Sequence, residues 1–407
     1  MRTRPSVTAA TDVRYAVTPT LHLGTISAIR PPGRVLRRLR TQIAPRPCLA
    51  RIAGSSDRRR FVVRGAAKNR TAKSAPGRHA HADRYALGVV ARRRSVVRFW
   101  RVDATHGAQG EWSISGYVII EAPSILGLFP GGVERLPEAL LAAGFADRLG
   151  ARHGGRVSPP PYDTRRDTVT GVLNPTGLRD YAHLLAAATG EVLDRGEIPI
   201  VLGGDCSILL GNLLALSRRG RYGLLFIDGH ADFYQPEAEP RGEAASMDLA
   251  LATGRGPSLL ADLEGRGPLV RDEDVAVFGR RDSAEAEQAG SQRVEDTAIA
   301  VVDLATIRQR GAERAARDVL AHLRRPELAG VWVHLDCDAV DDALMPAVDY
   351  RLPGGLSWAE LETVLRLAID GGPVVGIEIT IFNPTLDPDG AIAQELVACL
   401  VRALTRG

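Results

Sequence analysis

Short apolar runs alternate with longer amphipathic segments from about Tyr117 to the end of the chain. Runs rich in Val, Ile and Leu are typical of strands that are buried on both faces of a parallel sheet. They predict strands over 117–121, 198–202, 223–227, 275–278, 299–302, 331–335 and 374–379. The intervals between these runs leave room for crossover helices, which parallel strands require.

The segments between the strands carry apolar residues at helical spacing. They predict helices over 133–149, 175–195, 207–217, 244–253, 312–324, 357–369 and 391–404, with a loop over 154–174. Ser357 precedes Glu360 by three residues, which is the spacing of a capping box at a helix start. The order predicts one three-layer α/β/α domain with a mostly parallel, doubly wound sheet. Such sheets bind ligands beyond the carboxyl ends of their strands.

Three potential metal ligands follow the predicted strand 223–227 at alternating positions. They are Asp228, His230 and Asp232. Side chains at i, i+2 and i+4 of an extended segment lie on one side, so these three groups can face one ion. The alternative is a strand that ends in a polar turn, with the aspartates capping the following helix.

A second apolar run, 331–335, ends in the same way on Asp336 and Asp338. Two acidic strand ends of this kind favour one site that holds two ions. Carboxylates and imidazole suit Mn²⁺, and paired ions hold a hydroxide at neutral pH while they neutralise clustered carboxylates. His334 shares the face of Asp336 one layer deeper. We expect a hydrogen-bonded core histidine there, or one that supports a ligand, rather than a ligand itself.

Charge divides the chain into two parts. Residues 1–110 hold 24 Lys and Arg against four acidic residues, although the whole chain has a formal net charge of only +4. Arg-rich, acid-poor segments are typical of nucleic-acid-binding arms and of organelle-targeting peptides. This one lacks a sustained hydrophobic period and has scattered Pro and Gly. We therefore expect residues 1–115 to be a disordered basic extension and residues 116–407 to form the folded domain.

No secretory signal is expected, because the first thirty residues lack a continuous apolar core behind their basic start. No eighteen apolar residues run together either, so we expect a soluble, cytoplasmic protein. The cysteines Cys48, Cys206, Cys337 and Cys399 lie far apart and form no C-x-x-C pair. Neither a disulfide framework nor a zinc knuckle is indicated.

Three motifs occur in order: Gly-Gly-Asp-Cys-Ser at 203–207, Asp-Gly-His-Ala-Asp at 228–232 and Asp-Cys-Asp at 336–338. Gly-Gly-Leu-Ser at 354–357 and Asn-Pro at 383–384 follow them. With these motifs the chain resembles the arginase/agmatinase superfamily of ureohydrolases from about Tyr117 to Leu404. The resemblance implies an arginase-like fold with two Mn²⁺ ions bridged by a hydroxide. The hydroxide would attack a guanidino or amidine carbon and release an amine plus urea.

The resemblance also implies roles for individual residues. The metal ligands would be Cys206, Asp228, His230, Asp232, Asp336 and Asp338. The catalytic groups would be Glu378 and Asp232, of which Asp232 orients the hydroxide and later passes a proton to the leaving amine. The substrate would be bound by Tyr234, Gln235, Glu243 and Asn383. An ordinary loop is the alternative for the first two of these.

The first motif departs from the family at its fourth residue. The family usually has His there, whereas this chain has Cys206. A thiolate is a softer ligand than imidazole and favours zinc, iron or cobalt over manganese. Cys206 could instead be a small buried residue that binds no metal, and the sequence leaves both alternatives open. Asp205 beside it is expected to be a turn or N-cap group for the following helix.

Two further departures concern the substrate. Arginases carry an acidic residue two positions before the Asn-Pro, where this chain has Ile381, and the nearest acid is Glu378. The loop histidine that shuttles protons in arginases is absent from the matching segment 242–247. Glu243 is the candidate substitute, against the alternative of a solvated loop carboxylate.

These features favour an agmatinase-like or guanidino-acid-hydrolase-like enzyme over a strict arginase. The alternatives are an amide (deacetylase-like) hydrolase on the same fold and a metal-binding protein without turnover. The expected cofactors are two divalent metal ions, Mn²⁺ or, because of Cys206, Zn, Fe or Co. The expected partners are a small guanidino or amidine substrate and further copies of the chain in a homo-oligomer, with no specific nucleic acid and no membrane. The sequence names neither the exact substrate nor the subunit count.

Overall fold

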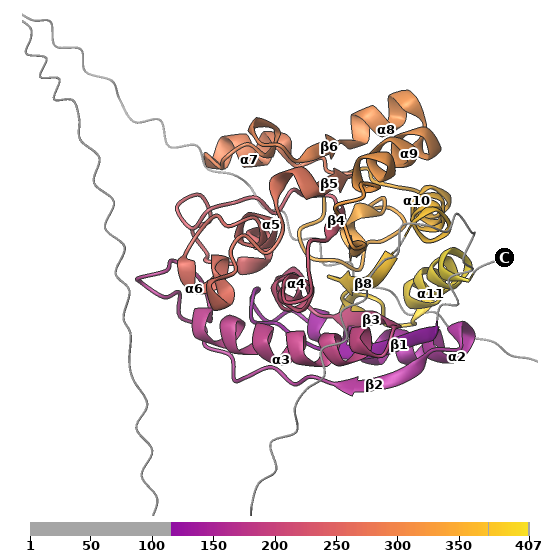
Figure 1. Cartoon of the computed structure of the whole chain (residues 1–407), viewed down its shortest axis with the longest axis horizontal. Coiled ribbons are helices and arrows are strands. Elements are labelled where there is room, and N and C mark those ends of the chain that lie inside the picture. Colours follow the sequence, from indigo (N-terminus) through magenta and orange to yellow (C-terminus); the bar gives the residue numbers. More distant parts are fainter. Residues whose placement is uncertain (1–114, 373, 406–407) are drawn as a thin grey trace, which may run out of the picture. The chain divides into compact units, whose positions relative to one another are not determined.

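The computed structural model describes residues 115–372 and 374–405 of the chain (Figure 1). The disordered extension predicted over residues 1–115 falls outside the described residues, apart from Ser115, which begins the first strand. Within the described part, none of the helices has the length and apolar character that a membrane crossing needs.

One eight-stranded sheet forms the centre of the described domain, and all its neighbouring strands are parallel. The spatial order is β2-β1-β3-β8-β7-β4-β5-β6. The strands are β1 (Ser115–Ala122), β2 (Arg152–Arg156), β3 (Glu197–Gly203), β4 (Gly223–Ile227), β5 (Val275–Phe278), β6 (Ala300–Val302), β7 (Val331–Asp336) and β8 (Val374–Thr380). This sheet confirms the predicted fold class.

Helices cover both faces of the sheet, as Figure 1 shows. They are α1 (Leu136–Ala142), α2 (Phe145–Leu149), α3 (Pro175–Asp194), α4 (Leu209–Ser217), α5 (Asp248–Ala252), α6 (Ser258–Ala261), α7 (Ser283–Ala289), α8 (Leu304–Arg310), α9 (Ala312–Leu323), α10 (Trp358–Gly371) and α11 (Ala391–Leu404). One apolar core joins the Ile119 face of the sheet to α1, α9, α10 and α11. A second core joins the Val118 face to α3, α4, α5 and α6. Successive strand residues point to opposite faces, so the central strands β1, β3, β4, β5, β7 and β8 contribute to both cores.

Every strand that the apolar runs predict is present, with its ends within two residues of the prediction. The edge strand β2 was not predicted. Its sequence is Arg-His-Gly-Gly-Arg and all its residues are exposed, so it leaves no apolar pattern to detect. It pairs only with β1 in the described sheet.

The single helix predicted over 133–149 is wrong. The segment consists of a 3₁₀ turn, η1 (Val133–Arg135), followed by α1 and α2. Gly144 separates the two helices with a φ of 83°, a left-handed conformation that an uninterrupted helix cannot contain. The segment predicted over 244–253 is likewise divided, into η3 (Ala244–Ser246) and α5.

The capping box predicted at Ser357 can be checked at the start of α10. The Ser357 hydroxyl accepts the Glu360 N–H at 3.3 Å and Glu360 accepts the Ser357 N–H at 2.8 Å, so the predicted capping box is confirmed at the start of α10. Helix α7 was not predicted, because none of its residues is buried and it has no apolar stripe.

Candidate metal centre

Loops that follow β4 and β7 meet beyond the carboxyl ends of these adjacent strands. The His230 N–H donates to Asp228 Oδ1 at 2.6 Å, and the Asp338 N–H donates to Asp336 Oδ1 at 2.7 Å. The Gly229 N–H donates to Asp338 Oδ1 at 3.0 Å across a sequence separation of 109 residues. The two acidic motifs therefore form one site, held by backbone amides.

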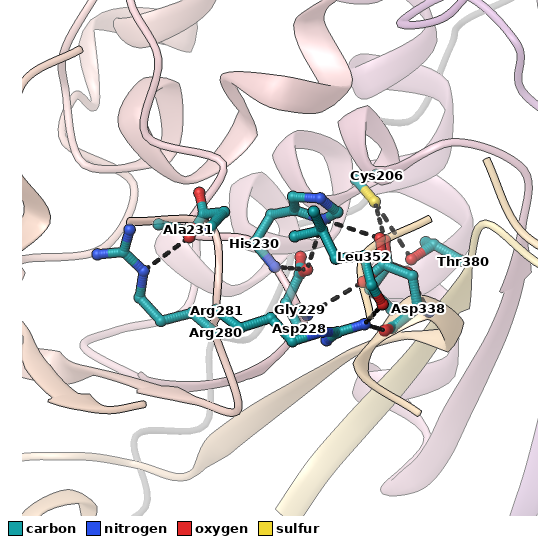
Figure 2. Close-up of polar contacts among 12 residues, drawn as sticks. Cys206, Asp228, Gly229, His230, Ala231, Arg280, Arg281, Asp338, Leu352 and Thr380 are labelled. Atoms are coloured by element: carbon teal, nitrogen blue, oxygen red, sulfur yellow. Dashed lines mark hydrogen bonds and ion pairs between the residues drawn. The ribbon is translucent and has the colours of Figure 1, made fainter. Parts of the chain in front are cut away.

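Gly229 permits this close approach of the two loops. A Cβ at position 229 would lie 2.3 Å from Nη1 of Arg281 and 2.8 Å from Oδ1 of Asp338. Arg281 donates through Nη2 to the backbone carbonyls of Asp338 at 2.8 Å and Leu352 at 3.1 Å (Figure 2). The guanidinium thus ties the Asp338 loop to the segment that contains Leu352.

One group of candidate ligands comprises Asp228, His230 and Asp338, whose ligand atoms all lie within 4.8 Å of one another. His230 Nδ1 is 2.9 Å from Asp338 Oδ2 and 3.7 Å from Asp228 Oδ1 (Figure 2). Both carboxylates are buried. The group offers one imidazole and two carboxylates to a single ion.

A second group comprises Cys206, His334 and Asp336, again within 4.8 Å of one another and all buried. Cys206 begins the 3₁₀ turn η2 (Cys206–Ile208) after β3. Its thiol contacts Asp336 Oδ2 at 2.9 Å and Thr380 Oγ1 at 3.3 Å (Figure 2). The structure therefore places His334 among candidate ligands, where the sequence favoured a core or supporting histidine.

Asp232 is a member of neither group of three, although it lies close enough to Asp228, His230 and Asp336 for their charges to shift its pKa. Strand β4 ends at Ile227, and Asp232 has a φ of 45°. The expectation that Asp228, His230 and Asp232 occupy one extended segment is wrong, because the chain bends at Gly229 and His230 and Asp232 itself is left-handed. The Asp232 side chain instead lines the cleft beside the centre.

Burial among like charges raises the proton affinity of the centre. Burial and the Asp338 carboxylate raise the pKa of Asp228 to about 6. Burial and Asp228 raise the pKa of Asp232 well above its usual range, and burial and Asp338 do the same for Asp336. Burial opposes ionisation of Asp338 as well, but His230 outweighs it and lowers the pKa of Asp338.

The nitrogen and sulfur groups are shifted too. Burial lowers the pKa of His230, but the Asp338 and Asp228 carboxylates outweigh it and raise that pKa well above 6.5. Burial and the nearby Asp336 raise the pKa of the Cys206 thiol. Cations that bind here must displace protons from these groups.

Buried atoms without partners show where cations fit. Among the described residues, Asp228 Oδ2, His334 Nε2 and both Asp248 oxygens make no hydrogen bond of normal geometry, and these side chains are fully buried. Buried polar atoms are almost always paired. Asp228 and His334 belong to the two groups of carboxylate oxygens, imidazole nitrogens and a thiol described above, which are a donor set for divalent ions. The residues fit two divalent metal ions.

A cleft of about 360 Å³ opens beside the centre, a size that suits a small molecule. Cys206, His230, Asp232, Asp336 and Asp338 line it from the centre. The remaining lining includes the apolar Leu128, Ala245 and Ile381 and the polar Tyr234, Glu239, Arg241, Glu243, Glu285, Asp349, Tyr350 and Arg351.

The four residues predicted to bind substrate separate into two pairs. Tyr234 and Glu243 line the cleft, whereas Gln235 and Asn383 lie outside the described lining. Gln235 donates to the Phe233 carbonyl at 2.5 Å and accepts the Gln292 N–H at 2.9 Å, so it holds loops together.

Asn383 supports the cleft wall from behind. It caps the 3₁₀ turn η8 (Pro384–Leu386), and its amide donates to Asp349 Oδ1 and to the Gly131 carbonyl, both at 3.1 Å. Asp349 itself lines the cleft. The geometry gives Asn383 a positioning role.

The alternative of a solvated loop carboxylate at Glu243 is wrong, because this side chain is only 2% exposed. It accepts the Phe129 N–H at 3.3 Å and the Tyr350 hydroxyl, and it forms an ion pair with Arg241 at 3.1 Å. Arg241 in turn lies over the rings of Phe129 and Tyr350. Arg241, Glu243 and Tyr350 therefore make one connected part of the cleft wall, and Phe129 packs against it.

Glu378 does not reach the described lining of the cleft. It is fully buried on β8, where it accepts from the Asn212 amide and lies 2.7 Å from His334 Nδ1. The placement fits a group that orients His334 rather than one that contacts substrate. Asp205 caps η2 through the Ser207 N–H at 3.0 Å, as expected.

Several residues of the site could not be identified from the sequence. Asp248 is a fully buried acid at the start of α5, and its sequence surroundings look like an ordinary helix start. Arg241, Arg281 and Tyr350 stand in loops without a motif, so only the tertiary contacts identify them. A buried acid without a partner is the signal for Asp248, and it requires coordinates.

Ile381 forms part of the cleft with a φ of 70°. A β-branched residue in the left-handed region is strained, and strain of this kind is concentrated at functional sites. The backbone is held there by the Ile381 N–H, which donates to the Gly204 carbonyl at 2.9 Å. An apolar side chain therefore occupies the wall where arginases were expected to carry an acid.

Comparison with known proteins supports the resemblance seen in the motifs. The sequence profile of the arginase family matches residues 117–406. An arginase of Staphylococcus aureus (strain MRSA252) is 27% identical over 291 residues, which cover 70% of this chain and 95% of the relative.

Solved structures agree with that match. The arginase from Bacillus cereus superimposes with a TM-score of 0.64 at 26% identity, covering 72% of this chain and 99% of that chain. The agmatine ureohydrolase of Thermoplasma volcanium gives a TM-score of 0.54 at 18% identity, covering 71% of this chain and 90% of that chain. At that lower identity the likeness concerns the fold alone.

Proposed function

The chain belongs to the arginase family, and from this premise we propose that it is a metal-dependent hydrolase of guanidino or other amidine compounds. It would cleave a C–N bond and release an amine and urea. One observation carries the proposal: two groups of buried candidate ligands lie next to each other beside a cleft of small-molecule size.

The proposed cofactors are two divalent ions, Mn²⁺ or the softer Zn²⁺, Fe²⁺ or Co²⁺. Their ligands would be Cys206, Asp228, His230, Asp232, Asp336 and Asp338. When bound, such ions lower the pKa of water towards neutrality and polarise the substrate. The amide donors of Gly229 and His230 keep the carboxylates oriented for them.

Asp232 is the proposed proton carrier. It lines the cleft, and burial with Asp228 nearby raises its pKa, so it accepts a proton readily. The water oxygen adds to the amidine carbon while the C–N bond breaks. Asp232 takes one of the two protons of that water and delivers it to the leaving nitrogen, which departs as a neutral amine. The second proton leaves to solvent, so a guanidinium substrate yields the amine, neutral urea and one proton.

The residues of the cleft wall would contact the substrate and so determine which compound binds. Tyr234 and the connected Glu243 and Tyr350 would bind its remote end. Ile381 supports a substrate other than arginine, because it offers a guanidinium no carboxylate at that point. An agmatine-like amine or a guanidino acid is therefore proposed over arginine itself, although the most similar curated relatives include arginases.

Two readouts test the proposal: urea release from arginine, agmatine and several guanidino acids, and amine release from acylated amines, each measured with Mn²⁺, Zn²⁺ and Co²⁺. We expect urea from at least one guanidino compound and much less from arginine. Amine release without urea from an acylated amine would replace the proposal with amide hydrolysis. No turnover of any compound by metal-loaded protein would leave a metal-binding protein instead.

A further inference from the structure

His334 is a buried group of the centre that lies outside the three motifs. We propose that His334 is a metal ligand at the Cys206 position, so that one ion is bound by sulfur, nitrogen and oxygen and the other by nitrogen and oxygen only. This inference rests on the two-metal centre of the proposed function. Its test reads metal binding and not urea.

The free nitrogen of His334 points to a ligand. The side chain is fully buried, Nδ1 is 2.7 Å from Glu378 Oε1, and Nε2 has no hydrogen-bond partner among the described residues. Nε2 lies 3.8 Å from Asp228 Oδ2, which also lacks a partner. Metal bonds of about 2.0–2.3 Å separate two ligands of one ion by roughly such a distance.

The same volume is bounded by the thiol of Cys206 and a carboxylate oxygen of Asp336. Ligand atoms of Cys206, His334 and Asp336 all lie within 4.8 Å of one another. One ion between them would satisfy the unpartnered Nε2 and Asp228 Oδ2 together. A purely structural histidine would leave both buried atoms unpaired, which is rare in folded proteins.

Neighbouring strands fix the orientation of the His334 ring. The parallel register sets His334 of β7 beside Glu378 of β8 and beside Phe226 of β4. Phe226 stacks on the imidazole with ring centroids 4.3 Å apart and an angle of 9° between the planes. The stack fixes the plane of the ring, and a flip within that plane would put a ring carbon in place of Nδ1 against Glu378 and lose the 2.7 Å contact, so Nε2 stays directed at the centre.

Glu378 completes the arrangement found around metal-binding histidines, which donate their other ring N–H to a carboxylate. Glu378 accepts from the Asn212 amide, and Asn212 accepts from the Thr189 hydroxyl at 2.8 Å. With Nδ1–H donated to Glu378, Nε2 keeps its lone pair for a cation. This chain of contacts explains why a carboxylate lies behind His334.

The ligand set predicts which ions bind. Thiolate and imidazole at the Cys206 position suit Zn²⁺, Fe²⁺ or Co²⁺, whereas the Asp228, His230 and Asp338 group also accommodates Mn²⁺. The two positions should therefore load with different preferences. It also follows that Cys206 binds metal as a thiolate.

Titration of the metal-free full chain with Co²⁺ tests the inference, with bound metal counted by elemental analysis. We expect two equivalents in the wild type and a thiolate-to-cobalt absorption band. His334→Gln should weaken one of the two positions by on the order of 100-fold or more, beyond the loss typical of a merely supporting residue, and should shift that band.

Two controls separate ligation from packing. Phe226→Leu removes the stacked ring but leaves both nitrogens of His334, so it should lower stability and keep two equivalents. His322→Gln makes the same exchange on α9, where the ring contacts the Glu273 carbonyl at 2.9 Å, and should change nothing at the centre.

X-ray absorption of the Co²⁺-loaded wild type decides the question even if His334→Gln fails to fold. Two imidazoles and one sulfur for each pair of ions are expected, and a single imidazole would overturn the inference. If folded His334→Gln binds Co²⁺ with the affinity and spectrum of the wild type, the inference is overturned. The proposed function is unaffected by that result, because the protein still binds two equivalents of metal. A wild type that binds no divalent metal would remove both proposals together.

Discussion

At the residue scale, the role of each polar side chain at the centre depends on which of its atoms are already engaged in contacts within the protein. Asp338 is engaged by His230 and Gly229 and holds one group of ligands together. Asp232 lines the cleft, where it can meet a substrate. Cys206 contacts Asp336 and Thr380, so its thiol is fixed at the other group.

Asp338→Asn and Asp232→Asn should each lower the metal content and abolish turnover, because an amide neither balances the charge of the ions nor carries the proton. Elemental analysis and urea release measure the two effects. Asp180→Asn on the surface of α3 makes the same exchange at a half-exposed position and serves as the control. Full metal stoichiometry in both site variants would refute the shared centre.

Cys206→Ser should weaken metal at one position, whereas Cys206→His should bind Mn²⁺ more tightly, because imidazole is the harder ligand. If Cys206 only packs behind the turn, Ser would cost about 1 kcal/mol of stability and leave metal content alone. Cys399→Ser on α11 provides a buried cysteine away from the site. Equal metal content and preference in all variants would exclude Cys206 as a ligand.

At the element scale, strand ends and helix starts position the site. The order β3-β8-β7-β4 sets the ends of four strands side by side, although these strands come from distant parts of the chain. Gly204 lets the loop after β3 lie against the loop after β1, because a Cβ at position 204 would lie only 1.7 Å from the Ser124 carbonyl oxygen. Side-chain caps by Asp205, Asp336 and Asn383 begin the 3₁₀ turns that follow β3, β7 and β8.

Ser357→Ala should destabilise the folded domain by about 1 kcal/mol, because it removes the hydroxyl that caps α10. Denaturant unfolding of the metal-loaded protein measures the change. Ser258→Ala, at an exposed position that is not an N-cap, should have little effect. A loss at Ser258 as large as that at Ser357 would contradict the capping account.

At the scale of the whole molecule, the centre couples metal, protons and folding. The pKa of Asp228 in the folded protein is about 6, which exceeds its value in the unfolded chain. The pKa of His230 is also higher in the folded protein. Groups with raised pKa values contribute stability at low pH that is lost as the pH rises through those values. Bound cations reverse this dependence, because they replace the protons.

The melting temperature of metal-free protein should therefore lose the contribution of Asp228 between about pH 4 and pH 7, while the stabilisation by added metal should grow over that range. Thermal unfolding with and without a chelator at pH 5 and pH 7.5 measures both. In Asp338→Asn the gain from metal should shrink. A metal-induced shift of equal size at both pH values would contradict the linkage.

A chain that begins near Gly116 should fold and retain the metal content and activity of the full chain. The proposal that residues 116–407 form the functional domain rests on the charge imbalance of residues 1–110 and on the family match, which begins at residue 117. Cooperative unfolding and metal analysis of both chains provide the comparison. Loss of cooperative unfolding in the shorter chain would refute it.

The sequence by itself determined the fold class and the positions of the acidic motifs. Strands buried on both faces are mostly apolar, so β4 and β7 are visible as runs, and the polar residues that follow them are visible by contrast. Ser357 and Asp205 were identified as caps for a similarly local reason. The exposed strand β2 and the turn at Gly144 were missed, because neither leaves an apolar period.

Only the tertiary structure decided which groups meet. His334, Glu378 and Phe226 lie on three strands, and their contact depends on a register that no local pattern encodes. The burial of Glu243 and the unpartnered atoms of Asp248 and His334 follow from the same long-range packing. Local sequence determines which residues follow the end of a strand. The neighbours of each side chain, and the polar atoms that remain without a hydrogen-bond partner, are determined by elements far away in the chain.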